Sequence, residues 1–297
     1  TIQNIIDFMQ NECQLTADYP DIFQKIFREH NVDEVGRQCR NVRGRNTMIK
    51  LEKVLKAFFN WLIKHEYTDN QPFKSIEIGT QKYGTPYFLT LEERNKIADF
   101  DIKKKYNSLT LKEQNKYKSG LDTMLTQRDI FIFQCLTACR VSDLVRLTIN
   151  SIDKDHILNY IAVKTKKSRQ NVISVPLNEQ AQKLVEKYKD VDKKGRLFPF
   201  TDLQKYNYAI KDVCRLCDID RLIDKLNPVT QNEEKMPLWR LASSHLARRT
   251  FAGNAYNKVQ DPNIICSMTG HVEGSQAFSR YRTIDNDLKK KVIDLIS

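Results

Sequence analysis

The sequence has no apolar run long enough to cross a bilayer, and no signal-peptide pattern opens it. It contains no Walker loop, no cluster of carboxylates for divalent metals and no zinc-finger spacing. Its seven cysteines are dispersed through helix-like segments, as expected of a protein in a reducing cytosol. The one CxxC, Cys214 to Cys217, has no second pair, so buried helix cysteines explain it better than a ligand or redox pair. These absences argue against a membrane protein, a P-loop enzyme and a metal site, and no cofactor is expected.

Charge is what the sequence has in excess. Lys and Arg total 49 against 37 Asp and Glu, which gives a net charge of +12. A chain this basic is expected to bind polyanions, although charge alone does not distinguish DNA from RNA or a membrane surface. Its 40% hydrophobic content predicts packed cores, and 297 residues suffice for two domains. The chain begins with Thr1 rather than Met, which is compatible with a fragment of a longer protein.

Residues 1–80 are predicted to form a helical domain. Between Thr47 and Lys64, apolar residues recur at intervals of three and four, which is typical of one helix face. Acids outnumber bases over 1–36, whereas bases outnumber acids over 37–56. This polarity fits either a phosphate-tracking surface or an ordinary solvated helix face. The candidate DNA contacts in this segment are Arg37, Arg40, Arg43, Arg45, Lys50 and Lys53.

A second domain is expected over 89–297, after a linker at 81–88 in the glycine- and proline-containing stretch Gly79–Pro86. Thr90 and Glu93 form a capping-box pattern, and the polar stretch 103–118 is expected to be a surface insertion or an exposed helix pair. The β-branched runs 157–163 and 172–175 predict an antiparallel hairpin. The predicted fold is mainly α with a small antiparallel β-sheet. Helices are expected at 125–147, 178–189, 201–217, 244–257 and 261–268, with a tail helix within 284–297.

Six residues scattered over the second domain make one chemical set, because together they can bind and attack a phosphodiester. Two guanidiniums can hold non-bridging oxygens bidentately and stay charged as negative charge builds up in the transition state. A lysine and two imidazoles can move protons, and a phenol can act as the nucleophile. The six are Arg140 (ACRVSDL), Lys164 (VKTKKS), His245 and Arg248 (SHLARRTF), His271 (MTGH) and Tyr281 (SRYRTID).

In type, order and local context this set resembles the tyrosine recombinases, the phage and transposon integrases. CLTACRVSDL is similar to the box Thr-Gly-x-Arg-x-Ser-Glu-Leu, with Ala138 in place of the glycine and Asp143 in place of the glutamate. SSHLARRTF is similar to the box His-x-x-Arg-(His or Arg)-Thr-Phe, and Met-Thr-Gly-His is close to Leu-Gly-His. The resemblance is strong over about 120–282 and is one of general pattern in the helical segment before the linker.

The resemblance implies a role for each of the six residues. Arg140 and Arg248 would hold the phosphate, His271 would donate to a phosphate oxygen, and His245 would exchange the nucleophile's proton. Lys164 would be the general acid for the departing 5′ oxygen, while Lys166, Lys167 and Arg169 compete for that role or hold DNA backbone. Tyr281 would attack phosphorus and form a 3′-phosphotyrosine, since Tyr256 lies on the His245 helix. Ser142 and Asp143 are interpreted as buttresses for Arg140, and Arg249 as a structural or backbone contact.

The family further implies a helical core-binding domain and an α+β catalytic domain that clamp double-stranded DNA at inverted-repeat core sites. A dimer on each site would form a homotetramer that exchanges strands through a Holliday junction, with DNA-bending accessory proteins as further candidate partners. Neither metal nor ATP would be needed, because the phosphotyrosine keeps the bond energy. A cytoplasmic, nucleoid-associated location in a bacterium, or a phage origin, is expected, with no membrane partner. The tail helix would pack on its own domain or on a neighbouring protomer.

Two other functions stay open at this point. A type IB topoisomerase shares the tyrosine chemistry but relaxes supercoils as a monomer with little site preference. A DNA-binding regulator on the same scaffold would bind without forming a covalent adduct. The presence of all six residue types argues against the regulator.

Overall fold

The structure, a computed structural model, describes residues 1–30, 42–163, 172–256, 258–259, 261–271, 274 and 293–294. The chain forms two compact units. The first unit is Thr1–Gly84 together with Asp224–Glu234, and the second is Thr85–Ile223 together with Lys235–Ser297.

The first unit is helical, with a small apolar core between its first and last described helices. Its helices are α1 (Ile2–Asp18), α2 (Pro20–Glu29) and α4 (Arg45–Lys64). The Thr1 side chain accepts from the N–H of Asn4 at the start of α1, and Pro20 begins α2, where its missing N–H costs no hydrogen bond. Ile2, Ile6, Met48 and Phe73 form the core.

Helix α4 buries only part of its predicted apolar face. Met48 and Ile49 are buried, and Leu51, Leu55 and Phe59 pack at the edge of the core. The periodicity predicted Val54 and Phe58 on the same face, but both side chains are more than half exposed. Trp61 is 48% exposed. The buried face that the spacing predicted is therefore too wide, because α4 packs against its neighbours along a narrower stripe of side chains.

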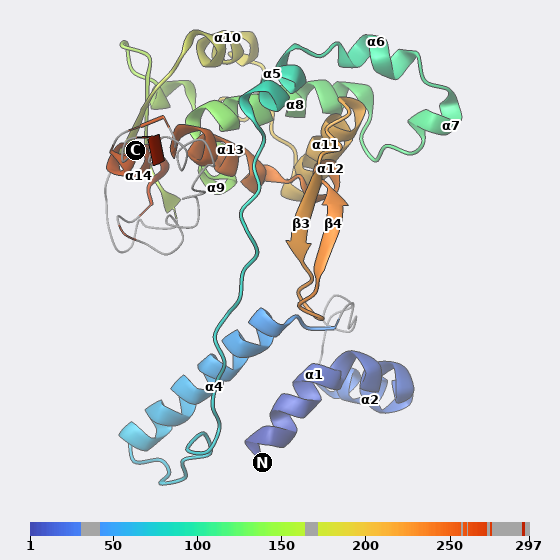
Figure 1. Cartoon of the computed structure of the whole chain (residues 1–297), viewed down its shortest axis with the longest axis vertical. Coiled ribbons are helices and arrows are strands. Elements are labelled where there is room, and N and C mark those ends of the chain that lie inside the picture. The colour runs from blue at the N-terminus through green and yellow to red at the C-terminus, as the bar shows by residue number, and fades with distance from the viewer. Residues whose placement is uncertain are drawn as a thin grey trace. The chain divides into compact units, whose positions relative to one another are not determined.

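The second unit is built around α8, which packs against α13, α11, α5 and α10 (Figure 1). Its sequence LDTMLTQRDIFIFQCLT is buried on most sides, as expected of a helix at the centre of a domain. The buried carboxylate of Asp129 on α8 is satisfied by Arg128 at 2.7 Å, Lys187 at 2.5 Å and the Tyr188 hydroxyl at 2.9 Å. The helices of this unit are α5 (Leu91–Asp99), α6 (Ile102–Asn107), α7 (Leu111–Gln114), α8 (Leu121–Thr137), α9 (Val141–Leu144), the 3-10 turn Ile149–Ser151, α10 (Glu179–Tyr188), α11 (Leu203–Leu216), α12 (Leu238–Leu241), α13 (Ser244–Tyr256) and α14 (Pro262–Thr269).

Several local predictions are confirmed. Thr90 caps α5 in a reciprocal capping box, with Glu93 N–H donating to Thr90 Oγ1 at 3.1 Å and Thr90 N–H donating to Glu93 Oε2 at 2.9 Å. The polar stretch 103–118 forms the short helices α6 and α7, with Leu111 largely exposed. Of the predicted tail helix, only Ile293 and Asp294 are described, and both are helical.

The predicted hairpin is present. Strand β1 (Ile157–Ile161) pairs antiparallel with β2 (Val172–Pro176), and Leu158 lies opposite Val175. These two apolar side chains face the core, since both are fully buried. The described residues thus form a mainly helical protein in which this hairpin is the small antiparallel sheet that the sequence predicted.

A second hairpin was not predicted. Strands β3 (Leu222–Leu226) and β4 (Glu233–Pro237) lie side by side (Figure 1). Their sequences LIDKL and EEKMP are rich in charge and poor in β-branched residues, so they carry little strand signal. The turn between them belongs to the first unit, where the Pro228 carbonyl accepts from Arg45 N–H at 2.8 Å.

Within the described part of the chain, no helix has the length and apolarity needed to span a bilayer.

Candidate active site

Arg140 stands at a sharp break between two helices. Helix α8 ends at Thr137, Ala138 takes the left-handed conformation with φ 56°, and Arg140 is the residue before α9. Its Nη2 donates to the carbonyl of Gly270 at 3.2 Å. Its Nη1 is buried and has no hydrogen-bond partner among the described residues. A buried guanidinium N–H with unused donor capacity is suited to bind an anion.

Arg248 lies on α13 and is only 2% exposed. Its Nη1 donates to the carbonyl of Ala138 at 2.9 Å, so the two arginine-bearing segments are joined directly. The left-handed turn at Ala138 is what points this carbonyl away from the α8 ladder. The usual residue in such a turn is glycine, and the alanine keeps the geometry at a cost of about 1–2 kcal/mol.

His271 follows the C-terminus of α14, where Gly270 takes the left-handed cap with φ 62°, as predicted. Its Nδ1 is 2.8 Å from Thr269 Oγ1, and both ring nitrogens are 3.3 Å from Nη2 of Arg248. Burial, and then the positive charges of Arg248, Arg140 and His245, lower the pKa of His271 to about 3. The imidazole is therefore neutral near pH 7, in a site whose electrostatics favour a negatively charged ligand.

Gly270 is required by its contacts as well as by its backbone angle. A Cβ at this position would lie 2.6 Å from Ile173 Cδ1 and 3.6 Å from Arg140 Nη1. A side chain at this position would therefore displace the tip of Ile173 and strain the left-handed backbone, whereas the Arg140 distance is an ordinary contact.

His245 lies one turn before Arg248 on α13, as the His-x-x-Arg spacing predicted, but the two side chains differ in environment. Arg248 is buried whereas His245 is exposed. His245 is near enough to His271 to contribute to its lowered pKa. The structure thus brings Arg140, Arg248 and His271 together: Arg248 contacts His271 directly, and backbone carbonyls of Ala138 and Gly270 link the two arginines to the neighbouring segments, with His245 at the margin.

Other predicted site residues lie outside the described residues. They are the general-acid candidate and its competitors, the nucleophile and two basic residues of the first unit: Lys164, Lys166, Lys167, Arg169, Tyr281, Arg37 and Arg40.

Asp143 accepts a hydrogen bond from the backbone of Val163, whereas it was interpreted from the sequence as a buttress for Arg140. The acceptor atom is its Oδ1, at 2.9 Å from the Val163 nitrogen. Val163 immediately precedes Lys164, so this carboxylate ties the Arg140 turn to the end of the strand segment that leads to the lysine. Its Oδ2 is buried without a hydrogen-bond partner in the described part of the chain. Because Asp143 and Val163 are 20 positions apart, the local sequence pattern did not predict this contact.

The residues of α13 that follow Arg248 bind the segment 87–89 at the start of the second unit. The Arg249 guanidinium lies 4.8 Å from the centre of the Tyr87 ring, which supports the structural interpretation of this residue. Thr250 Oγ1 accepts from Leu89 N–H at 3.1 Å, and Asn254 Nδ2 donates to the Leu89 carbonyl at 2.8 Å. These bonds fix α13, and with it Arg248, relative to residues 87–89.

Among the described candidate DNA contacts of the first unit, Arg43 differs from Arg45, Lys50 and Lys53. It is ion-paired with Glu12, and its Nη1 donates to the Met9 carbonyl at 2.5 Å, which gives it a structural role. Arg45, Lys50 and Lys53 are exposed along α4.

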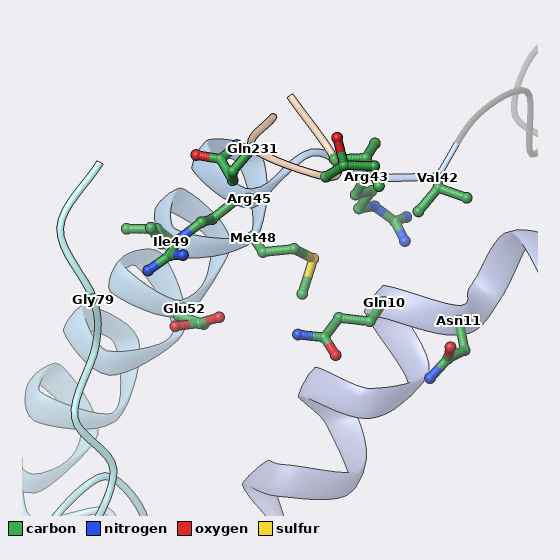
Figure 2. A pocket seen from close by; sticks show the side chains of 12 residues that line it. Gln10, Asn11, Val42, Arg43, Arg45, Met48, Ile49, Glu52, Gly79 and Gln231 are labelled. Carbon is green, nitrogen blue, oxygen red and sulfur yellow. The ribbon is translucent and has the colours of Figure 1, made fainter. Parts of the chain in front are cut away.

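A cavity of about 620 Å³ lies in this unit between α1 and α4. Figure 2 shows Arg45 and Glu52 of α4 on one side of it, with Gln10 and Asn11 of α1 on the other. Because the lining mixes one acid, two arginines and several amides, it indicates no particular ligand.

The described residues contain no group of three or more His, Cys, Asp or Glu that could hold a metal ion. Cys214 and Cys217 are fully buried on or beside α11, and burial raises the pKa of the Cys217 thiol to about 12. Their interpretation as buried helix cysteines is therefore confirmed.

The sequence profile of the phage integrase family matches residues 107–287. Solved structures that share the fold include the following three. A post-cleavage complex of XerH site-specific recombinase with palindromic difH substrate has a TM-score of 0.57 at 15% identity, covering 84% of this chain and 67% of that one. A lambda integrase dimer bound to a COC′ core site has a TM-score of 0.54 at 13% identity, covering 90% of this chain and 64% of that one. The Tn1549 transposon integrase with circular intermediate DNA has a TM-score of 0.53 at 15% identity, covering 91% of each chain. No curated protein matches the chain.

Proposed function

The chain belongs to the phage integrase family of tyrosine recombinases, and on this premise we propose that it cuts and rejoins DNA at specific sites through a 3′-phosphotyrosine intermediate. The observation that carries the proposal is the convergence of Arg140, Arg248 and His271 on one point of the second unit. Three elements distant in sequence meet there, and Arg140 keeps a buried N–H without a partner among the described residues. A phosphodiester oxygen is the acceptor that such a site would take.

In this proposal the two arginines bind the non-bridging oxygens and offset the charge that develops at phosphorus. Tyr281 attacks phosphorus, and its phenolic proton passes to His245, which lies exposed at the margin of the site. Lys164 gives a proton to the departing 5′ oxygen. Rejoining reverses these steps, with the 5′ hydroxyl of the partner strand displacing the tyrosine.

On the scale of the assembly, a dimer on each inverted-repeat core site and a tetramer across two sites would exchange strands through a Holliday junction. Exposed Arg45, Lys50 and Lys53 on α4 would contact phosphates, which position the protein on the duplex. The solved complexes of XerH, lambda integrase and Tn1549 integrase with DNA support this proposal by their fold alone. Integration or excision of a mobile element is the reaction that we propose.

Covalent trapping tests the proposal. The chain and its Tyr281→Phe variant would be incubated, without metal or ATP, with nicked duplexes that carry a randomised core. The expected result is an SDS-resistant protein–DNA adduct with the unmodified chain only, and sequencing the trapped DNA would give the site. DNA binding without an adduct from either protein would instead support a regulator, and relaxation of arbitrary supercoiled plasmid would support a topoisomerase.

A further inference from the structure

Thr269 makes two short contacts from one hydroxyl. It is the last residue of α14 and is fully buried. Its Oγ1 lies 2.6 Å from the carbonyl oxygen of Ile265, one turn earlier in the helix, and 2.8 Å from Nδ1 of His271. Neither contact has a role in the proposed reaction so far.

The shorter contact shows where the hydroxyl hydrogen lies. A threonine hydroxyl has a single hydrogen to donate and two lone pairs with which to accept. Two oxygens held 2.6 Å apart would repel each other without a hydrogen between them, so Thr269 donates to Ile265. Its lone pair then faces His271, and Nδ1 of His271 must carry the hydrogen of the 2.8 Å bond.

The second ring nitrogen follows from this assignment. Near pH 7 the imidazole is neutral and has one hydrogen, because burial and then the charges of Arg248, Arg140 and His245 lower its pKa to about 3. With that hydrogen on Nδ1, Nε2 has a lone pair. Nη2 of Arg248 lies 3.3 Å from each ring nitrogen and can donate to this lone pair.

We infer that Thr269 is a positioning residue that fixes His271 as its Nδ1–H tautomer, so that Nε2 takes up a proton when the scissile phosphodiester binds. This inference rests on the proposed function. Among the described residues, the charged groups that face His271 are Arg248 and His245 from α13 and Arg140 from the start of α9. A bound phosphate anion offsets these charges, and a proton from solvent then adds to Nε2. The resulting imidazolium donates from Nε2 to a phosphate oxygen and keeps its Nδ1–H on Thr269.

The geometry also explains why the reverse tautomer would not serve. Suppose instead that Nε2 carried the hydrogen in the free protein. The Thr269 hydroxyl would still donate to the Ile265 carbonyl, so a lone pair on Nδ1 would face a lone pair on Thr269 Oγ1 at 2.8 Å, and the two would repel each other. The Arg248 contact does not choose between the tautomers, because its Nη2 lies 3.3 Å from both ring nitrogens and meets one lone pair in either form, so the choice comes from Thr269.

Nitrogen NMR of the protein labelled with ¹⁵N-histidine tests the tautomer without requiring DNA cleavage. At pH 7 the His271 spectrum should show a protonated Nδ1 and an unprotonated Nε2, and Thr269→Ser should preserve that pattern. Thr269→Val, which keeps the shape but removes the hydroxyl, should lose it. Thr137→Val is the matched control, because it removes the same kind of helix back-bond at 2.9 Å to Phe133 and should leave His271 unchanged. A protonated Nε2 in the unmodified protein, or a Thr269→Val spectrum identical to it, would overturn the inference.

The reaction supplies the second readout. With Tyr281→Phe bound to a duplex site, Nε2 should become protonated at pH 7, and a neutral ring in that complex would contradict the proton uptake. Thr269→Val should slow formation of the covalent adduct by about five- to tenfold and shift its pH profile, as expected from one hydrogen bond, while Thr269→Ser restores both. If the rate of adduct formation and its pH profile are unchanged in Thr269→Val, Thr269 has no positioning role in the reaction. If the unmodified chain forms no adduct at any pH, the proposed function fails, whereas the tautomer is still decided by the spectra of the free protein.

Discussion

Arg140 and Gly270 lie 130 positions apart in the chain, and Nη2 of the arginine donates to the glycine carbonyl at 3.2 Å. This bond joins the turn after α8 to the turn after α14, and each turn depends on a left-handed residue, Ala138 or Gly270. The site is therefore held by backbone geometry at two helix ends, and its arginines and histidine are placed by these ends.

Gly270→Ala tests how tightly that junction is packed. The new methyl group would suffer left-handed strain and lie 2.6 Å from Ile173, so the free energy of unfolding should fall by about 2–4 kcal/mol. Gly195→Ala is the matched control, because Gly195 has φ 70° but no described atom lies within 4 Å of the point that its new methyl group would occupy. It should lose only the strain, about 1–2 kcal/mol. Equal losses in urea unfolding of the two variants would show that the Ile173 contact is unimportant.

Ala138→Gly should leave the site intact and raise the free energy of unfolding by up to about 1 kcal/mol. The residue has φ 56°, where alanine is strained and glycine is not, although glycine gives back part of the gain through its unfolded-state entropy. Ala252→Gly, in the middle of α13, has no such strain to relieve and should be destabilised by about 1 kcal/mol. Thermal or urea unfolding of both variants measures the difference, and destabilisation of both would contradict the role of the turn.

Arg248→Lys should slow covalent-adduct formation by about a hundredfold or more while DNA binding changes little. Lysine keeps the charge but cannot at once donate to the Ala138 carbonyl and hold a phosphate with a planar fork. Arg249→Lys is the neighbouring control, since the Arg249 guanidinium lies against the Tyr87 ring, and it should lose less than about tenfold. Adduct kinetics on a nicked duplex provide the measurement, and comparable losses in the two variants would argue against the assignment of Arg248.

Asp143→Ala should mimic loss of Lys164, because it leaves the Val163 N–H without the acceptor that fixes the residue before the lysine. Asp143→Asn retains an oxygen acceptor and should be the milder change. A substrate with a 5′-bridging phosphorothiolate needs no general acid, so it should rescue Lys164→Ala fully and Asp143→Ala in large part. Rescue of Lys166→Ala or Lys167→Ala in place of Lys164→Ala would move the general acid to another lysine. Failure to rescue Asp143→Ala would mean that the carboxylate acts on Arg140 instead.

The pH dependence of stability should include a contribution from His271. Its pKa is near 6.5 in the unfolded chain and is lowered to about 3 in the folded protein, so between these values the unfolded state binds more protons. The contribution is fully present above about pH 6.5 and is lost as the pH falls toward 3. His271→Asn should flatten the urea-midpoint profile in this window relative to the unmodified chain. An unchanged profile in His271→Asn would contradict this contribution.

Much of the site was visible in the sequence because its parts are local. The His-x-x-Arg spacing places two side chains one helical turn apart, Gly-His ends a helix, and Thr90 with Glu93 begins one. The β-branched runs 157–163 and 172–175 predicted the β1–β2 hairpin. Each of these signals depends on residues within a few positions of one another, so a short stretch of sequence contains all the physics that decides it.

What the sequence by itself determined was therefore the set of chemical groups, their order and the helices and strands that carry them. The tertiary structure decided which atoms form hydrogen bonds: Arg248 with the Ala138 carbonyl, Arg140 with the Gly270 carbonyl, and Asp143 with Val163 N–H. It left Val54 and Phe58 of α4 exposed. It also formed the charged β3–β4 hairpin, whose strands lack intrinsic strand propensity. The physical reason is that each of these hydrogen bonds joins a side chain to a backbone group that every residue has, and only packing selects which backbone group lies within hydrogen-bonding distance.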